Sequence, residues 1–191
     1  MGTHLLTASQ TIGPFFAPAL LRADARRNVL VQPETPGEHI RIEGRVLDGD
    51  GVAIPDAMIE IWQANADGHY NHGADQVSTD TAFLGFGRSG TEDASGYWFE
   101  TIKPGPVPFD AARLQAPHIC VTIFARGLLN HLVTRLYFAD EPGNASDPVL
   151  QHVPHDRQAT LLAKRGERGA KVIYTFDVIL QGAGETAFFN V

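Results

Sequence analysis

The sequence is poor in cysteine, because Cys120 is the only one in 191 residues. A single cysteine excludes a disulfide within the chain and a cluster of thiolate metal ligands from one chain. Basic residues are also few: 15 lysines and arginines stand against 22 aspartates and glutamates, which gives a formal net charge of −7. Because no cluster of basic residues offsets this charge, we expect no nucleic-acid partner.

Long apolar runs are missing as well. No stretch approaches the roughly 20 apolar residues that a membrane-spanning helix needs, so we expect no membrane partner. The chain begins MGTHLL, without a basic segment followed by a long apolar one, and we therefore expect no signal peptide. Together with the single thiol, these features predict a soluble protein of the cytoplasm.

Turn-forming residues, by contrast, are abundant. The chain has 19 glycines and 12 prolines, with few long helical patterns, and this favours many short strands joined by turns. A chain of this length can bury roughly 70% of its unfolded surface, so one core suffices. We see no internal repeat or linker. The sequence therefore predicts a single domain over residues 1–191, an all-β, antiparallel β-sandwich with an extended N-terminal arm and short helices.

Residues 1–38 are expected to form the N-terminal arm, in which only residues 19–27 favour a short helix. Its apolar side chains predict that it covers either the domain's own sheet or a partner chain. The sandwich is expected over residues 39–191. Alternating apolar residues predict its strands near residues 40–46, 54–64, 97–102, 117–125, 132–138, 158–164 and 171–180. Asp147 and Pro148 are typical of the start of a short helix that ends near His152.

Two residues stand where a metal could bind, and a third, Tyr70, is a further candidate site residue. His118 and Cys120 are two apart on a predicted strand, so both side chains point the same way. Tyr70 lies in a polar loop after an earlier strand. Each also has a structural interpretation, since a histidine beside a cysteine on a strand is often part of the core, and a tyrosine can simply cover a turn. The residues alone leave both interpretations open.

Arg126 follows a predicted strand and precedes a glycine, with no acidic residue close to it in the sequence. Its planar guanidinium suits a carboxylate ligand, although a surface arginine in a turn is an equally good interpretation. The chain contains no nucleophile motif of the Ser-His-Asp type, no glycine-rich phosphate loop and no H-E-x-x-H helix.

Taken together, these segments resemble the intradiol ring-cleavage dioxygenase family. Residues 42–70, IEGRVLDGDGVAIPDAMIEIWQANADGHY, match its signature pattern. Further similar segments are SQT-x-GP at 9–14, TIKPG at 101–105, APHI at 116–119, FARG at 124–127, TRLYF at 134–138 and QG-x-GET at 181–186. The resemblance covers essentially the whole chain.

The resemblance implies cleavage of a catechol by O2 between its two hydroxylated carbons, with Fe(III) held by two tyrosines and two histidines. Tyr70 and His118 correspond to the first tyrosine and the first histidine. Val107 stands at the second tyrosine position and Cys120 at the second histidine position. Valine cannot coordinate a metal, and cysteine coordinates only as thiolate. We therefore expect a degenerate site and no metal in this chain.

Some enzymes of the family combine an iron-free alpha chain with a homologous iron-bearing beta chain, and this sequence resembles the former. The resemblance then implies Fe(III) in the beta partner, a higher-order alpha-beta oligomer, and conversion of protocatechuate and O2 to 3-carboxy-cis,cis-muconate. By position, Arg126 would bind the substrate's carboxylate. The arm would wall the pocket with Thr11, Gly13, Pro14 and Phe15.

Two other functions stay open on the sequence alone. The chain could be a non-catalytic binding or scaffold module that keeps the sandwich without the chemistry. Alternatively, it could be a self-contained metalloenzyme that uses Tyr70, His118 and Cys120.

Overall fold

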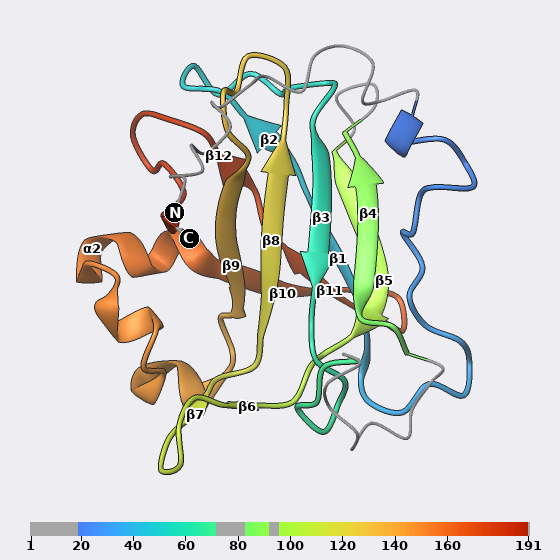
Figure 1. Cartoon of the computed structure of the whole chain (residues 1–191), viewed down its shortest axis with the longest axis vertical. Coiled ribbons are helices and arrows are strands. Elements are labelled where there is room, and N and C mark those ends of the chain that lie inside the picture. The colour runs from blue at the N-terminus through green and yellow to red at the C-terminus, as the bar shows by residue number, and fades with distance from the viewer. Residues whose placement is uncertain (1–18, 72–82, 92–95, 191) are drawn as a thin grey trace, which may run out of the picture.

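Most of the chain is built on one sheet of eight strands, in the order β4-β3-β8-β9-β10-β11-β1-β5 (Figure 1). The computed structural model describes residues 19–71, 83–91 and 96–190, so four predicted pocket residues lie outside the described part: Thr11, Gly13, Pro14 and Phe15. The eight strands are β1 His39–Gly44, β3 Met58–Trp62, β4 Phe86–Gly90, β5 Tyr97–Ile102, β8 His118–Phe124, β9 Leu132–Phe138, β10 Leu162–Arg168 and β11 Lys171–Thr175. Two small pairs complete the strands: β2 Val46–Leu47 with β12 Val178–Ile179, and β6 Val107–Pro108 with β7 Leu114–Gln115.

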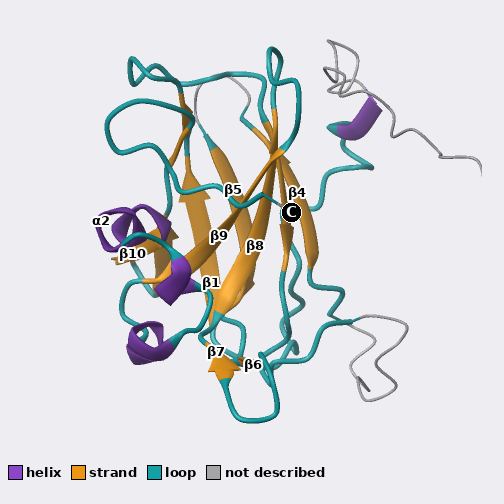
Figure 2. Cartoon of the chain, turned by 60° about the vertical axis from the view of Figure 1, so that its left-hand side comes forward, coloured by secondary structure: helices purple, strands orange, loops and turns teal. Residues whose placement is uncertain are grey.

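The sheet folds over on itself, and the two layers enclose one apolar core (Figure 2). The core forms because apolar and polar residues alternate along the strands, and every second side chain of a strand points inward. One layer contributes β3 and β8, and the other contributes β1 and β11. The buried side chains at the centre include Ile40, Ile42, Ile59, Ile61, Val121, Ile123 and Tyr174. The predicted β-sandwich is confirmed.

The sheet is mixed, which corrects the prediction of a purely antiparallel one. β1 pairs with β11 in parallel, and so do β9 with β10 and β2 with β12. β10 joins the two layers, since it pairs with β9 through Leu162 and Ala163 and with β11 from Lys164 onward. Alternation predicts which face of a strand is buried, but it carries no information about the direction of the neighbouring strand.

Residues 27–30 connect the two edges of the sheet, β4 and β5. Arg27 forms a bridge with Arg88 of β4, and the Leu30 amide donates to the Glu100 carbonyl of β5 at 2.8 Å. The Asn28 side chain donates to Ser89 Oγ at 2.8 Å and to the Trp98 carbonyl at 2.9 Å. The described end of the N-terminal arm therefore covers the domain's own sheet and nearly closes it.

Short helices lie along one side of the sandwich, between β9 and β10 in the chain (Figure 2). They are the 3-10 helices η2 Pro142–Ser146, η3 Leu150–His152 and η4 Ala159–Leu161, and the single-turn α2 His155–Gln158. The predicted helix of residues 147–152 is thus a 3-10 turn confined to its last three residues, and residues 158–161 are helical rather than a strand. No helix among the described residues is long and apolar enough to cross a membrane.

Candidate functional site

The loop that carries Tyr70 is held against the segment that leads into β6. Asn65 closes the loop, because its Oδ1 accepts from the amides of Asp67 at 3.0 Å and His69 at 2.9 Å. Gly68 has a φ of +82°, and a Cβ built on it would lie 2.0 Å from the carbonyl oxygen of Pro106. This close approach brings the first tyrosine position beside the segment of Val107, as the resemblance implies.

Tyr70 meets the start of β8 at His118. The Tyr70 hydroxyl lies 3.5 Å from His118 Nε2, and His118 Nδ1 lies 2.8 Å from the Ala116 carbonyl oxygen. Because a carbonyl only accepts, Nδ1 carries the proton and Nε2 is the acceptor for the tyrosine hydroxyl. The Tyr70 ring stacks on Trp62 with 6.0 Å between centroids, and Cys120 is the cross-strand partner of Trp62. Three of the four expected positions therefore come together.

The electrostatics of this cluster keep it neutral. Burial and the adjacent Cys120 raise the pKa of Tyr70 to about 12. Burial, followed by the positive charge of Arg135, lowers the pKa of His118 to about 4, and burial raises the pKa of Cys120. Arg135 lies opposite Cys120 on β9 and donates to Gln115 Oε1 at 2.7 Å. At neutral pH the cluster thus offers a phenol, a neutral imidazole and a thiol.

These residues do not fit Fe(III). A hard ferric ion favours anionic oxygen donors such as phenolate. Here only Tyr70 can supply such a donor, because the second tyrosine position is an alkyl side chain and the second histidine position is a thiol. Within the described residues, no group of three His, Cys, Asp or Glu side chains lies close enough to hold a metal ion.

Asp147 supports the cluster, and the sequence did not point to that role. It is fully buried, with Oδ2 accepting from the Ala116 amide at 2.7 Å and Oδ1 accepting from the Tyr137 hydroxyl at 3.1 Å. Oδ1 also accepts from the Leu150 amide at 2.6 Å. The Ala116 carbonyl accepts from the His118 ring, and Asp147 holds the Ala116 amide. Asp147 therefore orients the His118 ring indirectly, through Ala116. The helix-start signal at Asp147 was visible in the sequence, but its partner 31 residues earlier was not.

Arg126 lies just beyond the other end of β8 and is not free. Its Nε donates to the Asp56 carboxylate. β3 and β8 are antiparallel, with Met58 opposite Phe124. Asp56, two residues before Met58, therefore lies beside Arg126, two residues after Phe124. Asp56 is 70 residues away in the chain, which is why no acidic partner was visible near Arg126 in the sequence. The Arg126 side chain is 62% exposed and that of Asp56 is 26% exposed.

The two predicted sites are therefore far apart within one chain. His118 and Phe124 are the two ends of β8, and at ~3.3 Å per residue its seven residues separate those ends by about 20 Å. Arg126 cannot act on a ligand held at Tyr70 and His118 of the same chain.

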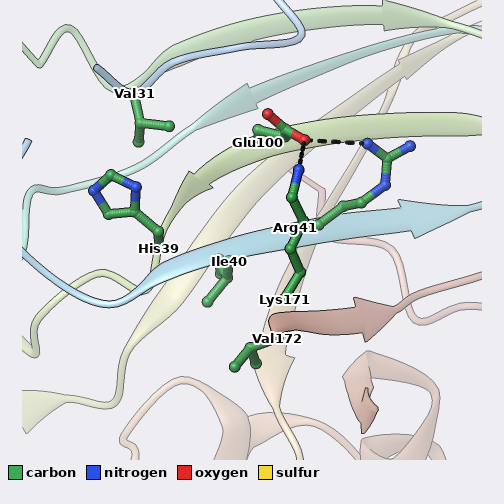
Figure 3. A pocket seen from close by; sticks show the side chains of 7 residues that line it. All are labelled: Val31, His39, Ile40, Arg41, Glu100, Lys171 and Val172. Carbon is green, nitrogen blue, oxygen red and sulfur yellow. Dashed lines mark hydrogen bonds and ion pairs between the residues drawn. The ribbon is translucent and has the colours of Figure 1, made fainter. Parts of the chain in front are cut away.

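A separate hollow lies at β5, β1 and β11 and is lined by side chains from both faces of that layer (Figure 3). Its volume is about 110 Å³, and Glu100 accepts there from Lys171 Nζ at 2.9 Å while Arg41 Nη1 lies 3.6 Å from the same oxygen. None of the site residues predicted from the sequence lines it. The pairing of its charges marks it as an ion-paired sheet surface.

The chain is similar to a known protein family and to several known proteins. A protein family described as "Dioxygenase" matches residues 12–182. The protocatechuate 3,4-dioxygenase alpha chain of Burkholderia cepacia is 43% identical over the full length of both chains. The beta chain of the enzyme from the same organism is 36% identical over 85% of this chain and 73% of its own. Among solved structures, the dioxygenase domain of a dioxygenase and carbohydrate-binding protein fusion from Streptomyces sp. SirexAA-E aligns with a TM-score of 0.65 and 28% identity, covering 94% of this chain and 97% of its own.

Proposed function

The chain belongs to the intradiol ring-cleavage dioxygenase family, and from this membership we propose that it is the alpha chain of a protocatechuate 3,4-dioxygenase. It acts with a homologous beta chain in the intradiol cleavage of protocatechuate by O2 to 3-carboxy-cis,cis-muconate. The observation that carries this function is the family match over residues 12–182 combined with valine and cysteine at two of the four positions where the family has metal ligands. Such a chain contributes to catalysis only next to a chain with an intact site.

The iron is assigned to the beta chain. Family members use Fe(III), and this chain offers a neutral phenol, a neutral imidazole, a thiol and a valine at the four positions where the family has ligands. Loss of even a supporting partner of a ligand typically lowers metal affinity about 10–100-fold, and here two ligands themselves are replaced. Alone, the chain is therefore iron-free and inactive.

Arg126 is assigned to the binding of the substrate's carboxylate at the pocket shared with the beta chain. Arg126 is exposed and follows the end of β8 that lies about 20 Å along the strand from His118, which supports a role at a pocket outside its own chain. A chain with a net charge of −7 repels an anionic aromatic acid at long range, and a local guanidinium offsets that repulsion.

The N-terminal arm is assigned to the wall of the same pocket, where it excludes water. Its described end supports this, because Leu20 and Leu21 pack with Met58 and Phe124, directly beside the Asp56 and Arg126 corner. The pocket residues of the arm are Thr11, Gly13, Pro14 and Phe15. We also infer a higher-order alpha-beta oligomer, and a cytoplasmic location that suits the single free thiol, Cys120.

The test is co-production of the chain with a beta chain in the presence of iron. The complex should be coloured by tyrosinate-to-Fe(III) charge transfer and should cleave protocatechuate, while the chain alone should be colourless. A colourless and inactive complex would contradict the proposal, and a coloured, active alpha chain on its own would favour the self-contained metalloenzyme.

Arg126→Ala in that complex tests the role of the arginine. Loss of a charge-assisted contact of roughly 1.5–3 kcal/mol should raise KM for protocatechuate about 10- to 150-fold. Catechol has no carboxylate, so its KM should change little. Steady-state kinetics with both substrates checks this, and an equal effect on the two would exclude a contact between Arg126 and the carboxylate.

A further inference from the structure

We propose that Asp56 is a positioning residue for Arg126: it holds the guanidinium in the orientation that receives the substrate's carboxylate. This inference rests on the proposed function, because it concerns the pocket shared with the beta chain. Neither residue is near the other in the sequence, and only the pairing of β3 with β8 brings them together.

The contact leaves the useful side of the guanidinium open. Asp56 Oδ2 accepts from Arg126 Nε, and within the described residues this is the contact that the guanidinium makes. A carboxylate can approach a guanidinium along the edge that includes Nε or across its two terminal nitrogens. With Nε occupied, the end formed by Nη1 and Nη2 remains, and it can bind both oxygens of a carboxylate at once.

Arg126 needs such a support because little else confines it. Its side chain is 62% exposed, and it is followed by Gly127, which has a φ of +87° and no neighbouring atom within 4 Å of a Cβ position. A long exposed arginine samples many rotamers, and holding one of them costs conformational entropy when a ligand binds. Asp56, 26% exposed in the turn before β3, is the better-fixed member of the pair. It removes part of that cost before the substrate arrives.

The opposite role for Asp56 would be competition with the substrate for the arginine. Direct competition for the same nitrogens would require Asp56 to occupy Nη1 and Nη2, whereas the contact is made through Nε. The geometry therefore points to a shared guanidinium, with one carboxylate of the chain on its side and the substrate's carboxylate on its end. The two roles predict opposite changes in KM when Asp56 is removed.

The experiment uses the complete alpha-beta complex, with protocatechuate and catechol as substrates. Asp56→Ala should raise KM for protocatechuate by about 10-fold, because Arg126 loses its support but not its charge. Asp56→Asn keeps a side-chain oxygen that accepts from Nε, so its KM should stay within about twofold of the original. Neither variant should change kinetics with catechol, which also shows that each complex is folded.

The matched control is Asp110→Ala, which removes the carboxylate of another exposed ion pair, the one between Asp110 and Arg113.

A double-mutant cycle separates action through Arg126 from an independent effect. If Asp56 acts through Arg126, Asp56→Ala should add nothing to Arg126→Ala. The inference is overturned if Asp56→Ala lowers KM for protocatechuate or leaves it unchanged. It is also overturned if the effects of Asp56→Ala and Arg126→Ala on this KM are additive, or if Asp56→Asn raises it as much as Asp56→Ala does. It also falls if Arg126→Ala leaves KM for protocatechuate unchanged, and that result alone contradicts the role of Arg126 in the proposed function. A large effect of Arg126→Ala with none of Asp56→Ala rejects only the positioning role.

Discussion

Single residues decide what the cluster at the start of β8 can bind. Tyr70 and His118 keep the side chains that the family uses, and the hydrogen bond from His118 Nδ1 to Ala116 keeps the ring in the tautomer that presents Nε2. Val107 and Cys120 stand at the two positions where the resemblance places the other ligands. What remains is a buried hydrogen-bonded core, in which the histidine is neutral because its environment disfavours a charge.

The neutral state of His118 predicts a loss of stability in acid. Its pKa is lowered from about 6.5 in the unfolded chain to about 4 in the folded one, so between these pH values the unfolded chain binds more protons. Stability should fall by up to roughly 3 kcal/mol as pH drops through that window, and His118 should contribute nothing to the pH dependence above it. His118→Gln should flatten this part of the curve, as measured by urea midpoints between pH 7 and 4. The exposed His155 provides the control variant His155→Gln, and an unchanged acid slope in His118→Gln would contradict the assignment.

At the scale of elements, loops place side chains that strands cannot. The loop from Asn65 to Tyr70 depends on Gly68, whose α-carbon faces the Pro106 carbonyl so closely that no side chain fits. β4, with the sequence FGRSG, depends on glycine in another way. A Cβ on Gly87 would lie 2.9 Å from the Ile61 side chain and 3.0 Å from those of Leu30 and Phe99, so the core approaches the strand backbone there. A strand built this way shows no apolar alternation, and for that reason the sequence did not predict β4.

The Gly68 contact can be separated from its backbone conformation. Gly51 has nearly the same φ, +78°, but no atom within 4 Å of a Cβ position. Gly51→Ala should therefore cost only the strain of a left-handed residue, about 1–2 kcal/mol. Gly68→Ala should cost that amount and a further ~1–3 kcal/mol for displacing the Pro106 segment. Urea denaturation of both variants measures the difference, and equal costs would mean that the close approach to Pro106 is unimportant.

At the scale of the whole molecule, two long-range features organise the fold. β10 changes partner along its length and so joins the two layers. Residues 27–30 tie the free edges β4 and β5 together. The antiparallel pairing of β3 with β8 then puts the degenerate cluster at one end of the sandwich and the Asp56 and Arg126 pair at the other. This arrangement is the one that the proposed role of Arg126 at a partner's pocket requires.

The edge closure by Asn28 predicts a local effect on dynamics. Asn28→Ala removes two hydrogen bonds, to Ser89 and to the Trp98 carbonyl, and should cost about 1–3 kcal/mol. The loss of protection should concentrate in β4 and β5 rather than in the central strand β8. Hydrogen exchange resolved by peptide measures this, with the exposed Asn130→Ala as the control. Uniform loss of protection over all strands would show that residues 27–30 have no special role in closing the sheet.

The sequence by itself determined the strand-rich fold, the limits of β5 and β9, and the presence of valine and cysteine at two positions where the resemblance places metal ligands. These are local properties: alternation records which face of each strand is buried, and a residue type at a motif position can be read directly. Only the tertiary structure decided that the sheet is mixed, that Asp147 supports His118, and that Asp56 pairs with Arg126. Each of these depends on which strands or loops become neighbours, and that choice is made by packing between residues far apart in the chain. The separation of His118 from Arg126 is different in origin, because His118 begins β8 and Arg126 follows its end, so the length of that one strand sets it.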